Sequence, residues 1–291
     1  DAELYDLTHA LDIALAGYDR AKAFEVLQRM EALDDNHLLT WSARRQLAAY
    51  DGNQKENERC VDALIGLFPK DGNLQLSKIS FLRSGPRNVL LEHLRALCKE
   101  KEADPIFYQQ FAIELVNDAR QEREAERLLR KNLSRRPNDA VSMQVLADLR
   151  WQQRKMEQAF ELYRFAASIE EKGEGPTRAL FAASRHLRKH HEVMAYLRDR
   201  FARFGRYSHL SLTTLFWSEV EVSEVAQAFK HLAQALEWRP EDAVLHCFAA
   251  DIFARFGKYD EAKKHLEHAR GRTRRQEWLR AAAQVATMAG N

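Results

Sequence analysis

The sequence is poor in the residues on which tight turns, metal frameworks and membrane spans depend. Only 11 Gly and 6 Pro occur among 291 residues, too few for the many turns of an all-β protein. The three cysteines, Cys60, Cys98 and Cys247, are isolated and form no C-x-x-C pair. This spacing argues against a zinc site or a disulfide framework and favours reduced, buried side chains. No apolar run approaches the length of a membrane span.

The chain also lacks an excess of charge of one sign. It has 45 Lys and Arg against 43 Asp and Glu, for a formal net charge of +2. Such a balance provides no general attraction to nucleic acid or to a membrane surface. Apolar residues make up 45% of the chain, enough to form a packed core, and the length suits two ordinary domains or one extended array.

Motifs that carry chemistry are lacking as well. The sequence has no Gly-rich phosphate loop, nucleophile elbow or H-E-x-x-H pattern. The string HLRKHHE at 186–192 places His186 and His190 four residues apart, a spacing that suits a metal on one helical face. The string crosses a predicted turn, however, and is interpreted as an exposed polar turn. We expect no catalytic residue, no metal and no cofactor.

What the sequence does contain is a repeated helical hairpin. Residues 243–256 show helical spacing of apolar residues and end at Gly257, and residues 258–270 do the same and end at Gly271. Small residues near the start of each second helix recur at spacings of 34, 36, 33 and 34: Ala125, Ala159, Ala195, Ala228 and Ala262. A period of this length is typical of stacked hairpins. Eight units are predicted, which begin near Leu4, Leu38, Gly72, Ile106, Ala140, Pro176, His209 and Ala243.

Two similar strings have a different spacing. RFARFGRY ends at Tyr207 and IFARFGKY ends at Tyr259, so they lie 52 residues apart. We interpret them as two helix ends with the same local role, each closed by a glycine cap at Gly205 or Gly257. The unit of repetition is therefore 34 residues rather than 52.

These hairpins resemble tetratricopeptide repeats. The resemblance is greatest over 243–271, where small and aromatic residues fall at the family's signature positions: Ala249, Ala250, Phe253, Gly257, Tyr259, Ala262 and Ala269. Pro69, Pro137 and Pro240 match the family's proline between units, and Trp41 matches its early tryptophan. The resemblance implies an all-α, right-handed superhelical solenoid of antiparallel hairpins. Residues 1–273 would form eight hairpins, and residues 274–291 a capping helix that covers the last one.

Two registers fit residues 38–105. In the first, Arg44 and Arg45 occupy positions where small or apolar residues are expected. A shift of three residues places Leu47, Ala48 and Cys60 there instead. The second register is the better match to a buried helix face.

The resemblance also implies a function, because the first helices of such hairpins line the concave side. We predict a protein-interaction scaffold that binds an extended peptide or partner protein there. The predicted groove residues are Tyr5, Gln110, Glu114, Asn117, Gln144, Asp148, Trp151, Ser184, Trp217 and Asp251. The alternative for Trp151 and Trp217 is packing between neighbouring helices.

Charge on these inner positions suggests the type of partner. We count six acids (Asp12, Glu114, Asp118, Asp148, Glu221 and Asp251) against three bases (Arg83, Arg188 and Arg255). A groove with this excess favours a neutral-to-basic segment. The inner positions do not present the set of Lys, Asn and Arg on consecutive first helices with which related repeats hold the terminal carboxylates of chaperones.

Several alternatives stay open at this point. The chain could be the regulatory or targeting region of a larger enzyme or secretion protein. It could bind nucleic acid through residues 263–280, which hold seven Lys or Arg against two Glu, although we favour an interpretation in which these charges keep the solenoid end soluble. Self-association is a further option. The expected location is the cytoplasm, or the periplasm if Asp1 is a processed terminus.

Overall fold

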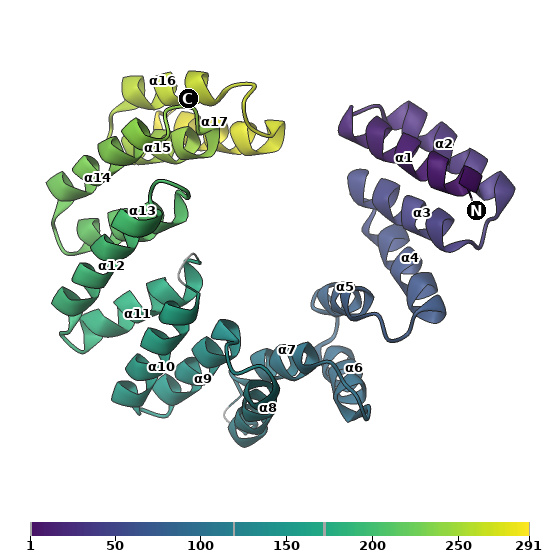
Figure 1. Ribbon diagram of the computed structural model, residues 1–291, viewed down its shortest axis with the longest axis horizontal. Coiled ribbons are helices and arrows are strands. Elements are labelled where there is room, and N and C mark those ends of the chain that lie inside the picture. Colours follow the sequence, from purple (N-terminus) through teal and green to yellow (C-terminus); the bar gives the residue numbers. More distant parts are fainter. Residues whose placement is uncertain (1, 119, 171–172, 291) are drawn as a thin grey trace. The chain divides into compact units, whose positions relative to one another are not determined.

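The computed structural model of the chain describes residues 2–118, 120–170 and 173–290. Over these residues it consists of 17 α-helices without a strand, which confirms the predicted all-α fold (Figure 1). None of these helices is long and apolar enough to cross a membrane. The chain divides into two compact units, residues 1–114 and 115–291.

The first unit is built from successive antiparallel helices. These are α1 (Ala2–Ala16), α2 (Arg20–Leu33), α3 (Leu38–Tyr50), α4 (Gln54–Leu67), α5 (Gly72–Leu82), α6 (Arg87–Lys99) and α7 (Pro105–Leu115), which ends at the unit boundary. Helix α1 packs against α2 and α3, and α3 packs against α4. Leu47, Ala48 and Cys60 are buried, whereas Arg44 and Arg45 remain half-buried, as the shifted register expects.

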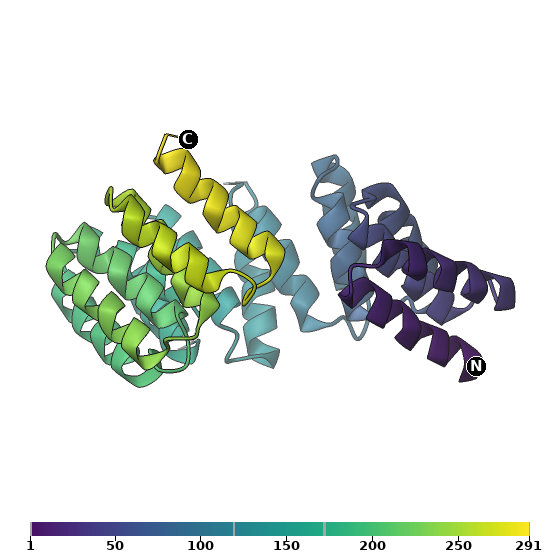
Figure 2. The ribbon, with the colours of Figure 1, turned by 90° about the horizontal axis from the view of Figure 1, so that it is seen from above.

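The second unit continues the same pattern with ten helices. They are α8 (Glu122–Arg135), α9 (Ala140–Gln152), α10 (Met156–Ile169), α11 (Gly175–His186), α12 (His190–Phe204), α13 (Leu210–Glu221), α14 (Val225–Trp238), α15 (Ala243–Arg255), α16 (Tyr259–Ala269) and α17 (Arg275–Met288). Each first helix packs against the second helix of its own hairpin, as α9 does on α10 and α15 on α16. The final helix, α17, lies against α15 and α16 (Figure 2).

Local chemistry explains where these helices begin and where the hairpins turn. Asp139 and Asp242 are the N-caps of α9 and α15, and their carboxylates accept hydrogen bonds from backbone N–H groups of the first turn. At the turn between α15 and α16, Gly257 adopts the left-handed conformation with φ of 73°, as its predicted cap role requires. The α9–α10 and α13–α14 turns place Arg154 and Ser223 in the same conformation, so glycine is not obligatory there.

The predicted cap at Gly205 proves to be of another kind. Its φ is −59°, an ordinary right-handed value, so the freedom of glycine to turn left-handed is not used. A Cβ atom at this position would instead lie 2.6 Å from the carbonyl oxygen of Phe201 and 2.7 Å from its ring. Glycine is therefore needed at 205 because Phe201 packs too closely for any side chain.

One of the five repeat alanines was assigned wrongly. Ala125, Ala159, Ala228 and Ala262 are fully buried, but Ala195 is exposed, and the buried residue at this place in α12 is Val193. With Val193 in place of Ala195, the spacings become 34, 34, 35 and 34. This position of the repeat is therefore buried in every one of these hairpins, and it accepts valine as well as alanine.

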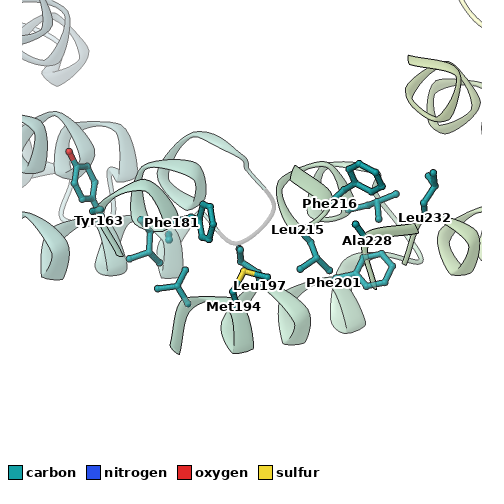
Figure 3. Close-up of a cluster of buried hydrophobic side chains, with 14 of the residues drawn as sticks. Tyr163, Phe181, Met194, Leu197, Phe201, Leu215, Phe216, Ala228 and Leu232 are labelled. Atoms are coloured by element: carbon teal, nitrogen blue, oxygen red, sulfur yellow. The ribbon is translucent and has the colours of Figure 1, made fainter. Parts of the chain in front are cut away.

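Buried side chains from several hairpins form one continuous core in the second unit. Figure 3 shows Met194 and Leu197 of α12 beside Phe181 of α11 and Leu215 of α13. Because each hairpin buries its apolar face only against its neighbours, this core is what holds α9 to α15 in a stack. The stack in turn places the first helices α9, α11, α13 and α15 next to one another.

Candidate binding groove

A pocket opens on three consecutive first helices of the second unit. Its volume is about 520 Å³, and α11, α13 and α15 line it with Arg178, Phe181, Ala182, Thr214, Trp217, Ser218, Glu221, Asp251 and Arg255. We call it the Trp217 pocket. Of the predicted groove residues, Trp217 and Asp251 are the ones that the structure brings together here.

Trp217 forms the aromatic wall of the pocket. Its ring packs edge-on against buried Phe216, with ring centroids 5.3 Å apart. The Arg255 guanidinium lies 5.6 Å from the ring centroid, within the range of a cation–π contact. Trp217 is half-buried, packs against the core of the second unit and also lines the pocket.

Polar groups of both signs surround this wall. Asp251 Oδ2 accepts a hydrogen bond of 2.9 Å from Arg255 Nε, while Asp251 Oδ1 is buried and has no hydrogen-bond donor within the described part of the chain. Glu221 pairs with Arg185. The Arg178 guanidinium reaches Glu174 only at 3.3 Å, and its side chain is 59% exposed. The pocket therefore combines an aromatic surface, an acceptor without a donor and an accessible guanidinium.

Next to the pocket, α9 carries three of the predicted residues. Trp151 is half-buried and packs edge-on against His186 of α11 at a centroid distance of 5.1 Å. Gln144 is half-buried. Asp148 accepts a 2.6 Å hydrogen bond from the Tyr163 hydroxyl. Burial raises the pKa of the Asp148 carboxyl, and the bond from Tyr163 opposes that rise.

Other predicted groove residues lie elsewhere. Ser184 was wrongly placed in the groove: it is fully buried, and its hydroxyl donates to the Phe181 carbonyl at 2.7 Å. Asn117 lies beyond the end of α7 and accepts a long hydrogen bond of 3.4 Å from Gln152. A buried serine and a residue of a turn cannot be told from inward-facing helix positions by spacing alone.

Tyr5, Gln110 and Glu114 belong to the first unit. Arg83 donates to both Glu114 (2.8 Å) and Gln110 (2.7 Å), which ties these two side chains to the neighbouring helix. Tyr5 is exposed on α1.

Most of the acids counted for the groove form hydrogen bonds within the protein. Five of the six acids counted from the sequence accept hydrogen bonds from other side chains: Glu114 from Arg83, Asp118 from Gln121, Asp148 from Tyr163, Glu221 from Arg185 and Asp251 from Arg255. Three of these acids are paired with arginines, so a partner would meet fewer free carboxylates than the sequence contains.

Sequence reasoning overlooked Arg178 and Thr214 as members of the pocket. A usable signal was present for Arg178, because Glu174 precedes it by four residues, and Asp251 precedes Arg255 by the same interval. Pairs with this spacing share one helix face. Two such pairs on alternate first helices indicate a polar inner surface.

In the part of the chain that the structure describes, no group of three or more His, Cys, Asp or Glu could hold a metal ion. The string at 186–192 spans a turn, since α11 ends at His186 and α12 begins at His190. That position agrees with its interpretation as a polar turn.

Comparison with known proteins supports the repeat architecture. Residues 221–285 match the family model described as tetratricopeptide repeat. The fold is similar to that of PilW, a widely conserved type IV pilus biogenesis factor, with 16% identity over 74% of this chain and 99% of that one, and a TM-score of 0.52. It is also similar to a tetratricopeptide repeat protein from Parabacteroides merdae ATCC 43184, with 11% identity over the whole of both chains and a TM-score of 0.51. None of the curated proteins matches the sequence.

Proposed function

Because this chain is a tetratricopeptide-repeat protein, we propose that it is an interaction scaffold that holds an extended segment of a partner protein against α9, α11, α13 and α15. The observation that carries the proposal is the Trp217 pocket, since it lies on three consecutive first helices. Neighbouring helices pack about 10 Å apart, so a segment of about ten extended residues reaches across the four helices.

Trp217 is the proposed anchor of the complex. A tryptophan that offers a large apolar surface and is already fixed by its neighbours loses little conformational entropy on binding. Phe216 and Arg255 provide this fixation. One apolar or aromatic side chain of the partner therefore enters the pocket and covers the exposed part of the ring.

Polar groups of the pocket would orient the segment. Arg178 donates to a backbone carbonyl of the partner, because its side chain is mostly exposed. The charged side chains of the pocket are two Arg, one Glu and one Asp. This balance favours the neutral end of the neutral-to-basic range expected from the sequence.

Helix α9 would extend the contact beyond the pocket. Trp151 and Gln144 are half-buried and provide a second aromatic surface and an amide. Asp148 contributes indirectly, because its bond to Tyr163 holds α9 on α10.

The proposal can be tested before any natural partner is known. A display library of random peptides is selected against the intact chain, and the enriched peptides are titrated by calorimetry against the wild type and Trp217→Ala. We expect affinity to fall roughly 30-fold, equivalent to about 2 kcal/mol for a central tryptophan. Phe165→Ala is the matched control, because Phe165 is an exposed aromatic on α10 and does not line the pocket.

A second variant guards against loss of folding. Arg178 is mostly exposed, so Arg178→Glu should leave helicity unchanged and still weaken peptide binding. Glu221→Lys tests the charge preference and should slow the association of basic peptides. Equal affinity for the wild type, Trp217→Ala and Arg178→Glu would show that the segment binds elsewhere.

A further inference from the structure

A second surface lies on α1, which exposes a residue of core type. Ile13 is 71% exposed. Leu47, Leu115 and Leu149, which lie one, three and four repeat lengths further on, are at most 5% exposed. The repeat thus places an apolar residue at this point of a first helix so that it can be covered. On α1 the cover is absent among the residues that the structure describes.

The rest of this face is acidic and aromatic. Tyr5, His9, Asp12 and Ile13 share one side of α1, because His9 lies four residues after Tyr5 and three and four residues before the other two. Tyr5 is 63% exposed. Helix α1 contains Glu3, Asp6 and Asp12 but no Lys or Arg. These acids form no ion pair with any residue in the described ranges. We call this surface the α1 face.

The complementary chemistry occurs around α17. Residues 270–280 hold five Arg and a single Glu. Arg272 pairs with Glu241 and Arg270 lies near Glu267, but Arg274, Arg275 and Arg280 have no acidic partner within salt-bridge distance in the described structure. All three of these arginines are exposed.

A pocket lies beside Arg275, one of these three arginines. Its volume is about 450 Å³, and it is lined by Arg270, Gly271, Thr273, Arg275, Trp278 and Leu279. Trp278 Nε1 donates to the Leu266 carbonyl at 2.8 Å, which fixes the ring. The Arg270 guanidinium lies 5.8 Å from the ring centroid. Leu279 is half exposed. The result is an apolar socket with a basic rim.

We infer that the α1 face of one copy of this chain docks on the α17 socket of a second copy. Exposed Ile13 has acids beside it, and the apolar socket has arginines beside it, so the two surfaces are complementary in hydrophobicity and in charge. Opposite charges steer the encounter, and burial of Ile13 and Leu279 supplies apolar stabilisation. The contact would cover Ile13 with helices, as the repeat does at Leu47 and Leu149.

The two surfaces are different, so the contact is heterologous. Each copy has one α1 face and one α17 socket, and association therefore continues into longer chains or closes into a ring. Neither surface includes a residue of the Trp217 pocket, so this inference is independent of the proposed function.

Charge exchange between the two surfaces tests the inference. Sedimentation velocity is measured over a concentration series for the wild type, for Asp6→Lys with Asp12→Lys, and for Arg275→Glu with Arg280→Glu. All four residues are exposed, so the fold should be retained, and circular dichroism verifies this. We expect the wild type to associate with rising concentration, each variant alone to remain monomeric, and the equimolar mixture of both variants to associate again.

A matched control for the arginine variant has the same charge change in a turn and on α14. Lys101→Glu with Lys230→Glu alters two exposed lysines away from both surfaces and should associate as the wild type does. Raising the salt from about 0.1 M to 1 M shortens the Debye length from about 10 Å to 3 Å and should weaken association. Ile13→Ser should also weaken it, without a change in net charge.

Three results would overturn the inference. The first is a monomeric wild type at every concentration in low salt. The second is association that survives both charge reversals. The third is a change of monomer shape in the variants without any dependence on concentration, which would indicate contact within one chain. Binding of single-stranded DNA by a monomeric wild type, abolished by Arg275→Glu with Arg280→Glu, would assign the socket to nucleic acid instead.

Discussion

The substitution Ala262→Phe should destabilise the last hairpin of the second unit, whereas the same change at Ala195 should be nearly neutral. Ala262 is fully buried and belongs to a small cluster with Ala250, Ala254, Leu266 and Val285. Ala195 occupies the second helix of an earlier hairpin but is exposed. The two variants add the same ring to the same type of helix, so they differ in burial alone.

The expected magnitude follows from the packing around Ala262. Small residues of α15 and α16 let these helices approach closely, and a phenyl ring between them must push α15, α16 and α17 apart. Overpacking of this kind typically costs about 1–3 kcal/mol. In a unit of this size each kcal/mol lowers the melting temperature by about 2–4 °C.

Native-state hydrogen exchange is the appropriate assay, because a stacked array can open at one end while the remainder stays folded. Amides of α15 and α16 should lose protection in Ala262→Phe, while those of α9 and α10 should keep it. Neither region should change in Ala195→Phe. Equal protection in the two variants would refute the assignment of Ala262 to the buried face.

Further predictions concern a glycine, a histidine and a tyrosine. Gly205→Ala should be destabilising because its Cβ would overlap Phe201, while Gly66→Ala, in open space on a helix, should stabilise by about 0.5–1 kcal/mol; urea unfolding compares them. Burial, and to a smaller extent two neighbouring imidazoles, lowers the pKa of His265 from 6.5 to about 4. As the pH drops from 6.5 to 4 the unfolded chain binds a proton that the folded chain does not, so the free energy of unfolding should fall. This fall should be less steep in His265→Gln. Tyr163→Phe should raise the pKa of Asp148 further, as NMR titration of the carboxyl carbon would show.

The repeat architecture was readable from the sequence because it depends on local signals. The Asp residues that begin α9 and α15, the left-handed Gly257 and the apolar spacing between them act within a few residues of chain. Predicted hairpin starts fall within two residues of the observed helices, as at Leu38, Gly72 and Ala140. A 34-residue period then repeats this local information, and stacking follows because no single hairpin can bury its own apolar face.

The candidate site was less accessible to such reasoning. Trp217 and Asp251 were identified from helical position, but the same argument included Ser184, which the neighbouring hairpins bury completely. The count of acids likewise contains no information on contacts within the protein. A count of acids treats Asp148 as a free carboxylate, whereas the structure bonds it to Tyr163 of another helix.

The sequence by itself determined the helices, their pairing and the length of the repeat, since these follow from propensity, caps and periodicity along the chain. The tertiary structure decided which side chains are buried and which line the pocket. Val193 rather than Ala195 turned out to be buried, Gly205 proved necessary for the approach of Phe201, and Arg178 came to stand beside Trp217 from a different helix. Each of these depends on how the surrounding side chains pack, which the place of a residue within the 34-residue period does not specify.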